Sequence, residues 1–162
     1  PPRSTLFPYT TLFRSDGYVD ITASSYPYFA EYEVKPSTSI KELLNAGVPI
    51  EHITMTSDGN GSLPHFDDNG ELVRLEMGQP KSIFTEMSEA VTMDKLPLEA
   101  ALKTVTSNVS RILKLRNKGN IRVGADADIV IIENDFTIVE VISRGKVMLS
   151  DKKLLTKGTY EH

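Results

Sequence analysis

Two runs of apolar residues at helical spacing lie between β-forming segments, and this alternation is the feature that most limits the fold. One run begins near Pro80 and the other near Pro97, and a proline suits the first turn of a helix. The apolar positions are Ile83, Phe84, Met87, Ala90 and Val91 in the first run, and Leu98, Ala101, Leu102, Val105, Val109, Ile112 and Leu113 in the second. We expect two amphipathic helices whose apolar faces pack into a core.

A strand, a helix and a second strand are expected upstream. Residues 18–23 alternate β-formers with small or polar residues, which is typical of a strand. A helix over about 40–46 is expected to be capped by Ser37 or Thr38 and ended by Gly47. Residues 51–57 then predict a second strand.

After Arg116 the pattern changes to short β-rich runs separated by turn residues, at 128–132, 137–142 and 146–149. This pattern predicts a small, mostly antiparallel sheet at the end of the chain. Strand, helix, strand, helices and a final sheet indicate an α/β protein that holds the last βα units of a parallel barrel. Because a complete (β/α)₈ barrel takes about 250 residues, only its C-terminal part fits here.

Composition narrows the class of function. Lys and Arg total 18 against 22 Asp and Glu, so the net charge is −4, and no basic cluster marks a nucleic-acid-binding face. The absence of cysteine excludes disulfides and thiolate metal sites. No apolar run approaches the roughly 20 residues that span a bilayer. We expect a cytoplasmic protein with neither nucleic acid nor membrane as a partner.

The first fifteen residues, PPRSTLFPYTTLFRS, follow neither a two-residue nor a 3.6-residue rhythm. They can be written codon by codon as a common short-read sequencing adapter. We therefore expect residues 1–15 to be a translated, non-native segment and the native sequence to begin near Asp16, with the upstream part of the parent protein missing.

The segment Thr56-Ser57-Asp58-Gly59-Asn60-Gly61-Ser62 is the candidate site. It places the Asp58 carboxylate at the C-terminal end of a predicted strand, where barrel enzymes keep catalytic groups. Its glycines allow sharp turns and close approach to a ligand, and the Ser62 hydroxyl could point into the same pocket. The alternative from the residues alone is an Asx turn, since Asp, Asn, Gly and Ser are the usual turn formers.

Other metal sites do not fit the spacing. A calcium loop starting at Asp58 would need Gly where Leu63 stands and Glu where Asn69 stands. The three histidines show neither a His-x-His nor a His-Glu-x-x-His pattern. No complete metal site is therefore visible in this sequence.

Three segments resemble a known family. Residues 56–62 followed by 66–72 resemble the region around the eighth barrel strand of isoaspartyl (β-aspartyl) dipeptidases, which belong to the amidohydrolase superfamily. Residues 118–130 resemble the return of an amidohydrolase chain into its small β-sandwich. Residues 141–147 and 157–161 resemble the dipeptidase C-terminus. The resemblance implies residues 16–115 as the last βα units of a TIM-like barrel and 116–162 as part of the β-sandwich.

The resemblance also implies an activity. In that family a binuclear zinc centre hydrolyses the amide that joins an aspartate side-chain carboxyl to the next residue. By resemblance Asp58 is a metal ligand and the catalytic base, Ser62 binds the dipeptide substrate, and the parent protein forms a homo-oligomer. The family's remaining metal ligands lie upstream of this sequence, so we expect the chain by itself to bind zinc weakly and to be inactive.

Two other interpretations are open. The parent could be another amidohydrolase with a different amide substrate, such as a dihydroorotase, a hydantoinase or a D-aminoacylase. From a different class, the chain could be a non-catalytic β-rich binding module in which Asp58 merely caps a turn. The Asn-Gly-Ser that follows Asp58 favours the dipeptidase over the other amidohydrolases.

Overall fold

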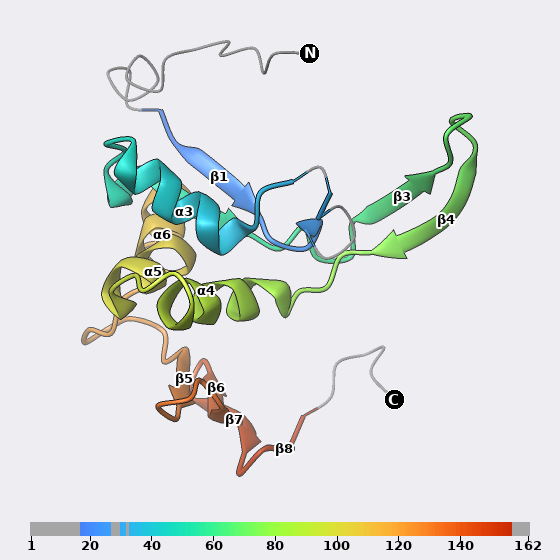
Figure 1. Ribbon diagram of the computed structural model, residues 1–162. Helices are drawn as coiled ribbons and strands as arrows, with labels where there is room; N and C mark the ends of the chain where they lie inside the picture. The colour runs from blue at the N-terminus through green and yellow to red at the C-terminus, as the bar shows by residue number, and fades with distance from the viewer. Residues whose placement is uncertain (1–16, 27–29, 32, 157–162) are drawn as a thin grey trace. The chain divides into compact units, whose positions relative to one another are not determined.

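The computed structural model describes residues 17–26, 30–31 and 33–156, so segment 1–15 lies outside the described residues. Helices and strands fall into two units, residues 1–109 and 110–162 (Figure 1). The elements that begin in the first unit are β1 (Val19–Thr22), α3 (Pro36–Asn45), the 3₁₀ turn η1 (Ile50–His52), β2 (Ile53–Thr56), β3 (Ser62–Phe66), β4 (Leu72–Met77), α4 (Ser82–Thr92), α5 (Leu98–Val105) and α6 (Ser107–Ile112). The second unit holds β5 (Ile129–Ile132), β6 (Ile138–Ser143), β7 (Lys146–Ser150) and β8 (Lys153–Leu154). The domain limits at 115 and 116 stay a prediction.

Strands β1 and β2 form a parallel pair, with Val19 opposite Ile53 and Thr22 opposite Thr56. The chain travels from one to the other through α3, as a parallel connection requires. The strand predicted over 18–23 is therefore confirmed. The strand predicted over 51–57 begins too early, because the chain first turns through η1.

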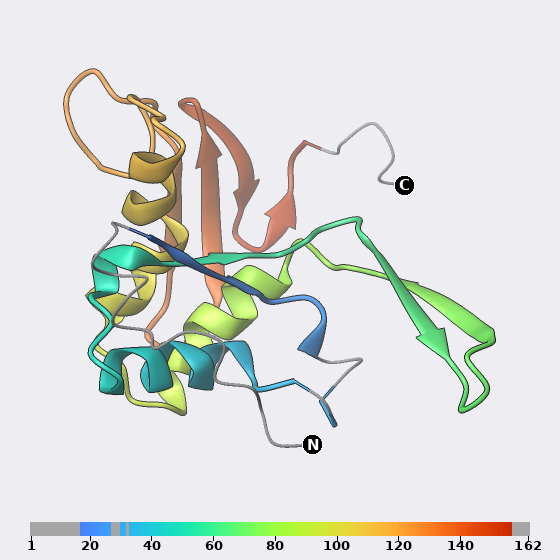
Figure 2. The same ribbon diagram turned by 90° about the horizontal axis from the view of Figure 1, so that it is seen from above.

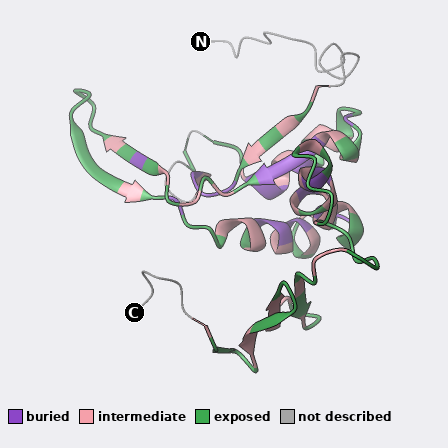
Figure 3. Cartoon of the chain, turned by 180° about the vertical axis from the view of Figure 1, so that it is seen from behind, coloured by how far each residue is buried: buried purple, intermediate pink, exposed green. Residues whose placement is uncertain are grey.

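One face of this parallel pair is packed against helices (Figures 1 and 2). On β2, Ile53 and Met55 are 0% and 1% exposed, while Thr54 and Thr56 point to the opposite face because strand side chains alternate. The buried apolar residues supplied by the helices are Ile40 of α3, Met87 and Ala90 of α4, and Ala101 of α5. Figure 3 shows this buried zone between β2 and the helices. The predicted apolar faces are therefore core only in part, because Leu98 and Leu113 are 43% and 62% exposed.

Helix α3 starts earlier than predicted and ends as predicted. Pro36 is its first residue, no side chain at the preceding Lys35 caps it, and so the proposed Ser37 or Thr38 cap is wrong. Gly47 has φ +86°, and the Gly47 and Val48 N–H groups donate to the carbonyls of Leu44 and Leu43 at 3.0 Å each. This pair of bonds is a Schellman motif, for which glycine is favoured because it adopts positive φ without a Cβ clash.

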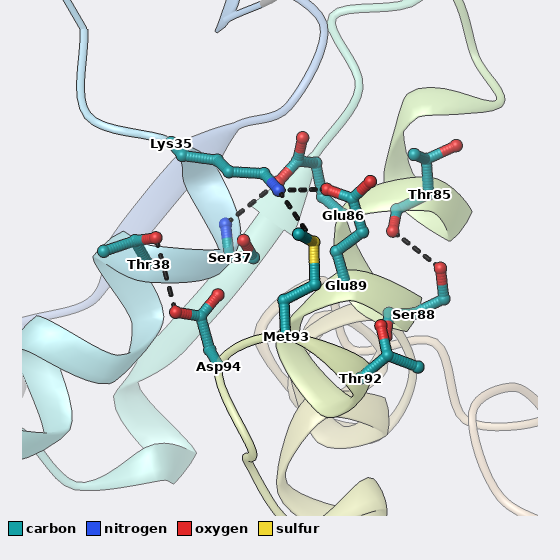
Figure 4. Close-up of polar contacts among 10 residues, drawn as sticks. All are labelled: Lys35, Ser37, Thr38, Thr85, Glu86, Ser88, Glu89, Thr92, Met93 and Asp94. Atoms are coloured by element: carbon teal, nitrogen blue, oxygen red, sulfur yellow. Dashed lines mark hydrogen bonds and ion pairs between the residues drawn. The ribbon is translucent and has the colours of Figure 1, made fainter.

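The cap of α3 comes from another helix (Figure 4). The Glu86 carboxylate of α4 accepts the backbone N–H of Ser37 at 3.0 Å, and Glu86 is only 5% exposed. Nearby, Lys35 forms an ion pair with Glu89, and Thr38 donates to Asp94 at 3.4 Å. A carboxylate at the first turn of α3 accepts a backbone N–H that would otherwise have no acceptor within the helix. Its negative charge also interacts favourably with the helix dipole. The contact therefore locks α3 to α4.

The helix predicted from Pro97 to Leu113 is two helices, α5 and α6. The break is at Thr106, whose φ of −128° and ψ of −90° are not helical. After the break, the Asn108 side chain donates to the carbonyls of Ile50 and Ile53 at 2.7 and 2.9 Å. The break between α5 and α6 is therefore followed by a buried amide that satisfies two backbone carbonyls near the start of β2.

Strands β3 and β4 form an antiparallel hairpin that the sequence analysis missed. It projects away from β1, β2 and the helices of its unit (Figures 1 and 2). The Asp67 carboxylate closes the turn by accepting the N–H groups of Asn69 and Glu71, each at 2.9 Å. These bonds, with that to Glu71 the strongest, hold the pKa of Asp67 below its ordinary value.

The second unit is a four-stranded antiparallel sheet in the order β5-β6-β7-β8, which confirms the β unit predicted after Arg116. Lys118 forms ion pairs with Asp126 and Asp128, and the Asp128 carboxylate accepts the Arg144 N–H at 2.8 Å. These contacts lower the pKa of Asp128, the Lys118 bond most. Within the described residues, no helix is both long enough and apolar enough to cross a membrane.

Replacing Glu86 tests its role as the cap of α3. We expect Glu86→Ala to lower the free energy of unfolding by about 1–3 kcal/mol, because the buried Ser37 N–H loses its acceptor. Glu86→Gln, which keeps an acceptor oxygen, is the matched control and should lose little. Urea unfolding followed by circular dichroism measures both, and equal losses in the two variants would contradict the capping role.

The difference in stability between Glu86→Gln and the wild type should depend on pH. Burial raises the pKa of Glu86, although the Ser37 N–H and Lys35 oppose the rise. The folded state therefore binds the proton more tightly than the unfolded state. The resulting stabilisation is full below the ordinary pKa and is lost as pH rises through the raised value. Glu86→Gln should thus gain stability relative to the wild type between acidic and neutral pH.

Candidate active site

The candidate site lies at the edge of the parallel pair where both strands end. The Ala23 N–H donates to the Thr56 carbonyl at 2.8 Å, which continues the pairing beyond the last residue of β1. Ser24 follows Ala23, and Ser57 and Asp58 follow β2. Parallel strands end at a common edge, so these residues are brought together from segments more than 30 residues apart.

The loop after β2 is fixed by its own backbone. The Gly61 N–H donates to the Asp58 carbonyl at 2.9 Å, the Asn60 N–H donates to the Gly78 carbonyl at 2.8 Å, and the Gly78 N–H donates to the Gly61 carbonyl at 2.9 Å. Asp58 and Asn60 have φ of 47° and 65°. Asp and Asn tolerate this left-handed region better than other non-glycine residues. The loop is therefore tied to the residue that follows the hairpin.

The Asx-turn alternative for Asp58 is wrong. An Asx turn needs the side chain to accept the N–H two residues on, but the Asn60 N–H is taken by Gly78. The Ser57 hydroxyl instead accepts the Gly59 N–H at 3.0 Å. Within the described residues no hydrogen bond or ion pair engages the Asp58 carboxylate, and Asp58 is exposed. This carboxylate is available to a ligand, unlike that of Asp67.

Glycines make room for Asp58 on two sides. A Cβ at Gly61 would lie 2.6 Å from Asp58 Oδ1, and a Cβ at Gly78 would lie 2.3 Å from the Asp58 carbonyl oxygen and 2.7 Å from Ser24 Oγ. Real Cβ contacts are not this short. Gly61 therefore leaves space for the carboxylate, and Gly78 leaves space for the backbone that carries it.

Ser62 is the first residue of β3 and is exposed. It lies opposite Met77 of β4, so their side chains share one face of the hairpin. Within the described residues no hydrogen bond joins the Ser62 hydroxyl to Asp58. The structure thus brings Asp58 and Ser62 into one short loop without joining their side chains.

The described part of the chain supplies few metal ligands. No group of three or more His, Asp or Glu side chains in it could hold a metal ion. His52 lies before β2, at the opposite end of the strand from Asp58, with Nδ1 2.7 Å from the Gly17 carbonyl oxygen. His162 lies outside the described residues. The Asp58 carboxylate is exposed and has no partner among the described residues, and Gly61 leaves space beside it, so it fits one ligand of a metal centre.

Sequence reasoning missed two parts of this site. Ser24 is 2% exposed, and its hydroxyl has no hydrogen-bond partner in the described part of the chain. A lone serine after a strand gives no signal. Gly78 could have been found. The turn sequence Asn69-Gly70 ahead of a β-rich run indicates a hairpin, and the hairpin returns the chain to Asp58.

A methyl group added at Gly61 tests the Asp58 carboxylate, and one added at Gly78 tests the Asp58 backbone. We expect Gly61→Ala to leave thermal stability nearly unchanged, because the flexible Asp58 side chain can move aside, and to lower any activity that depends on this carboxylate. Gly78→Ala should lower both stability and activity, because the Asp58 backbone must shift. Gly70→Ala, at a glycine with open space around it but φ +81°, controls for loss of stability alone. Equal activity of Gly61→Ala and wild type would contradict the view that the Asp58 carboxylate needs the space beside Gly61.

Comparison with known proteins identifies the family of the chain. The amidohydrolase family model matches residues 18–148. The crystal structure of a β-aspartyl dipeptidase from the thermophilic, keratin-degrading Fervidobacterium islandicum AW-1, in complex with the β-Asp-Leu dipeptide, is 33% identical, with a TM-score of 0.80 over 97% of this chain and 40% of that chain. A second structure of a β-aspartyl dipeptidase from this organism is 28% identical, with a TM-score of 0.72 over 97% of this chain and 38% of that one.

A more distant match supports the fold alone. N-acetylglucosamine-6-phosphate deacetylase from Pasteurella multocida is 18% identical, with a TM-score of 0.59 over 82% of this chain and 37% of that chain. The chain spans about two fifths of the length of each of these proteins. The predicted α/β fold, part of an amidohydrolase barrel, is thereby confirmed, and the chain belongs to the amidohydrolase family.

Proposed function

We propose that this chain is the C-terminal part of a metal-dependent isoaspartyl dipeptidase, which hydrolyses the β-aspartyl peptide bond of dipeptides. The observation that carries the proposal is the Asp58 carboxylate, which is exposed, unpaired among the described residues and located where β2 ends. Two solved structures to which this chain is similar are β-aspartyl dipeptidases, and one of them is in complex with β-Asp-Leu.

Asp58 is assigned two roles in this proposal, metal ligand and catalytic base. Zinc ions, when bound, supply Lewis acidity to the scissile carbonyl and a nucleophile at neutral pH. Asp58 takes the proton of the attacking water and passes it to the leaving amine, as a general base that becomes a general acid. The fixed loop backbone supports this role, because a base must be held within hydrogen-bond reach of the proton it removes.

Ser62 is assigned to the bound dipeptide. Its hydroxyl has no hydrogen-bond partner among the described residues and is exposed at the base of the hairpin, so it can donate to a substrate carboxylate or accept from a substrate amine. We expect Ser62→Ala to raise KM more than it lowers kcat. Steady-state kinetics on β-aspartyl-leucine measure the two constants, with Ser143→Ala at the end of β6 as the control for loss of an exposed hydroxyl.

The decisive test uses the full-length enzyme, recovered with its coding sequence upstream of Asp16. We expect hydrolysis of β-aspartyl-leucine but not of α-aspartyl-leucine in the presence of zinc. Asp58→Asn should lower kcat by at least about 100-fold, since general acid–base catalysis contributes about 10² to 10⁴. Inactivity on both peptides, with hydrolysis of a cyclic amide or an N-acyl amino acid, would move the protein to a sister amidohydrolase.

The chain as given should bind zinc weakly and show no peptidase activity. In this proposal Asp58 is the one metal ligand among the described residues, and a catalytic zinc site takes three protein ligands. Metal analysis after dialysis measures the zinc content. Stoichiometric, tightly held zinc in the wild-type chain that is lost in Asp58→Asn would contradict this expectation.

We also expect zinc as the metal and a homo-oligomer as the assembled state, both from the family resemblance, and the cytoplasm as the location, from the composition. The binding-module alternative is disfavoured, because the family model matches most of the chain and Asp58 does not cap a turn.

A further inference from the structure

A polar cluster lies on the face of the parallel pair that is opposite to the helices. None of its residues has a role in the function proposed above. Side chains of Asp20, Thr22, Thr54 and Thr56 share this face, because they alternate with Val19, Ile21, Ile53 and Met55 along the two strands. Asp20 and Thr54 are direct cross-strand neighbours, and Thr56 is two residues further along β2.

Both oxygens of the Asp20 carboxylate are engaged by β2. Thr54 Oγ1 donates to Asp20 Oδ1 at 2.6 Å, and Thr56 Oγ1 donates to Asp20 Oδ2 at 2.7 Å. These lengths are those of charge-assisted O–H···O bonds, which are stronger than neutral ones. One carboxylate therefore fixes two successive positions on this face of β2 against β1.

The bond from Thr56 to Asp20 lies at the C-terminal end of β2. Thr56 is the last residue of β2, and Asp58 follows two residues later, with φ of 47°. The Thr56 carbonyl also accepts the Ala23 N–H, so this residue is held from both its backbone and its side chain. We infer that Asp20 is a positioning residue, which acts through Thr56 to set where Asp58 leaves the sheet.

This inference rests on the proposed function, because it needs Asp58 to act on substrate. A displacement of about 1 Å in a reacting group can lower a rate by about 100-fold. In the full-length enzyme, Asp20→Ala should thus lower kcat by about 10- to 100-fold and change KM by less than about twofold. Asp20→Asn, whose amide can accept from one threonine and donate to the other, should recover most of this loss.

Thr56→Val and the double variant test whether the two residues act together. Val nearly matches Thr in shape and removes only the hydroxyl. If Asp20 acts through Thr56, the double variant should be no slower than the slower single variant, since residues in one network are not additive. Thr56→Val also carries the test if Asp20→Ala does not fold. Asp94→Ala, which removes a carboxylate–threonine contact at α3, is the matched control and should keep its kcat.

The outcomes separate this inference from the proposed function. If Asp20→Ala lowers thermal stability but keeps the wild-type kcat, or if its loss multiplies with that of Thr56→Val, Asp20 is structural and the inference fails. If the wild type cleaves another amide in place of β-aspartyl-leucine, the proposed substrate fails, and the same series on that amide decides the role of Asp20. Wild-type activity of Asp58→Asn would overturn both.

Discussion

The parallel pairing of β1 with β2 is the constraint on which the rest of the first unit depends. It sets Val19 opposite Ile53 and so directs Ile53 and Met55 toward the helices, where apolar burial stabilises the unit. The same register turns Asp20, Thr54 and Thr56 to the other face and brings Ser24 and Asp58 to one edge. A shift of the register by one residue would exchange the two faces and would place polar side chains in the core.

Asp58 and Asp67 both precede an Asn-Gly pair, but only the Asp67 carboxylate accepts hydrogen bonds from its own turn. Their hydrogen-bond partners explain the difference. Asp67 stands before Asn69-Gly70, and its carboxylate is used by the N–H groups of its own turn. Asp58 stands before Asn60-Gly61, but Gly78 takes the N–H that would close an Asx turn. A residue 20 positions away in the sequence therefore leaves the Asp58 carboxylate without a partner among the described residues. Local turn chemistry alone would give the wrong answer.

Periodicity and turn residues were enough to predict the β1, α3, α4 and α5 segments and the final sheet, because each follows from local patterns. They failed where the decisive contact is distant. The α3 cap comes from Glu86 on another helix, and the break at Thr106 places Asn108 on the carbonyls of Ile50 and Ile53. For the site, the Asp58 segment was located from its glycines and its place after a strand. The buried Ser24 and the two threonine bonds of Asp20 depend on strand register, which sequence spacing does not reveal.

The β3–β4 hairpin has a further consequence for the dynamics of the site. Its exposed apolar side chains include Phe66, Val73 and Leu75, which are at least 60% exposed, and a two-stranded hairpin without a covered face is only marginally stable. Its tip should therefore open at low free-energy cost, while the bonds from Gly78 to Asn60 and Gly61 hold its base. Such graded local unfolding would move Phe66, the last residue of β3, more readily than Ser62, the first residue of β3. Whatever surface covers the hairpin would thus decide how rigidly its tip is held, while Ser62 stays near Asp58.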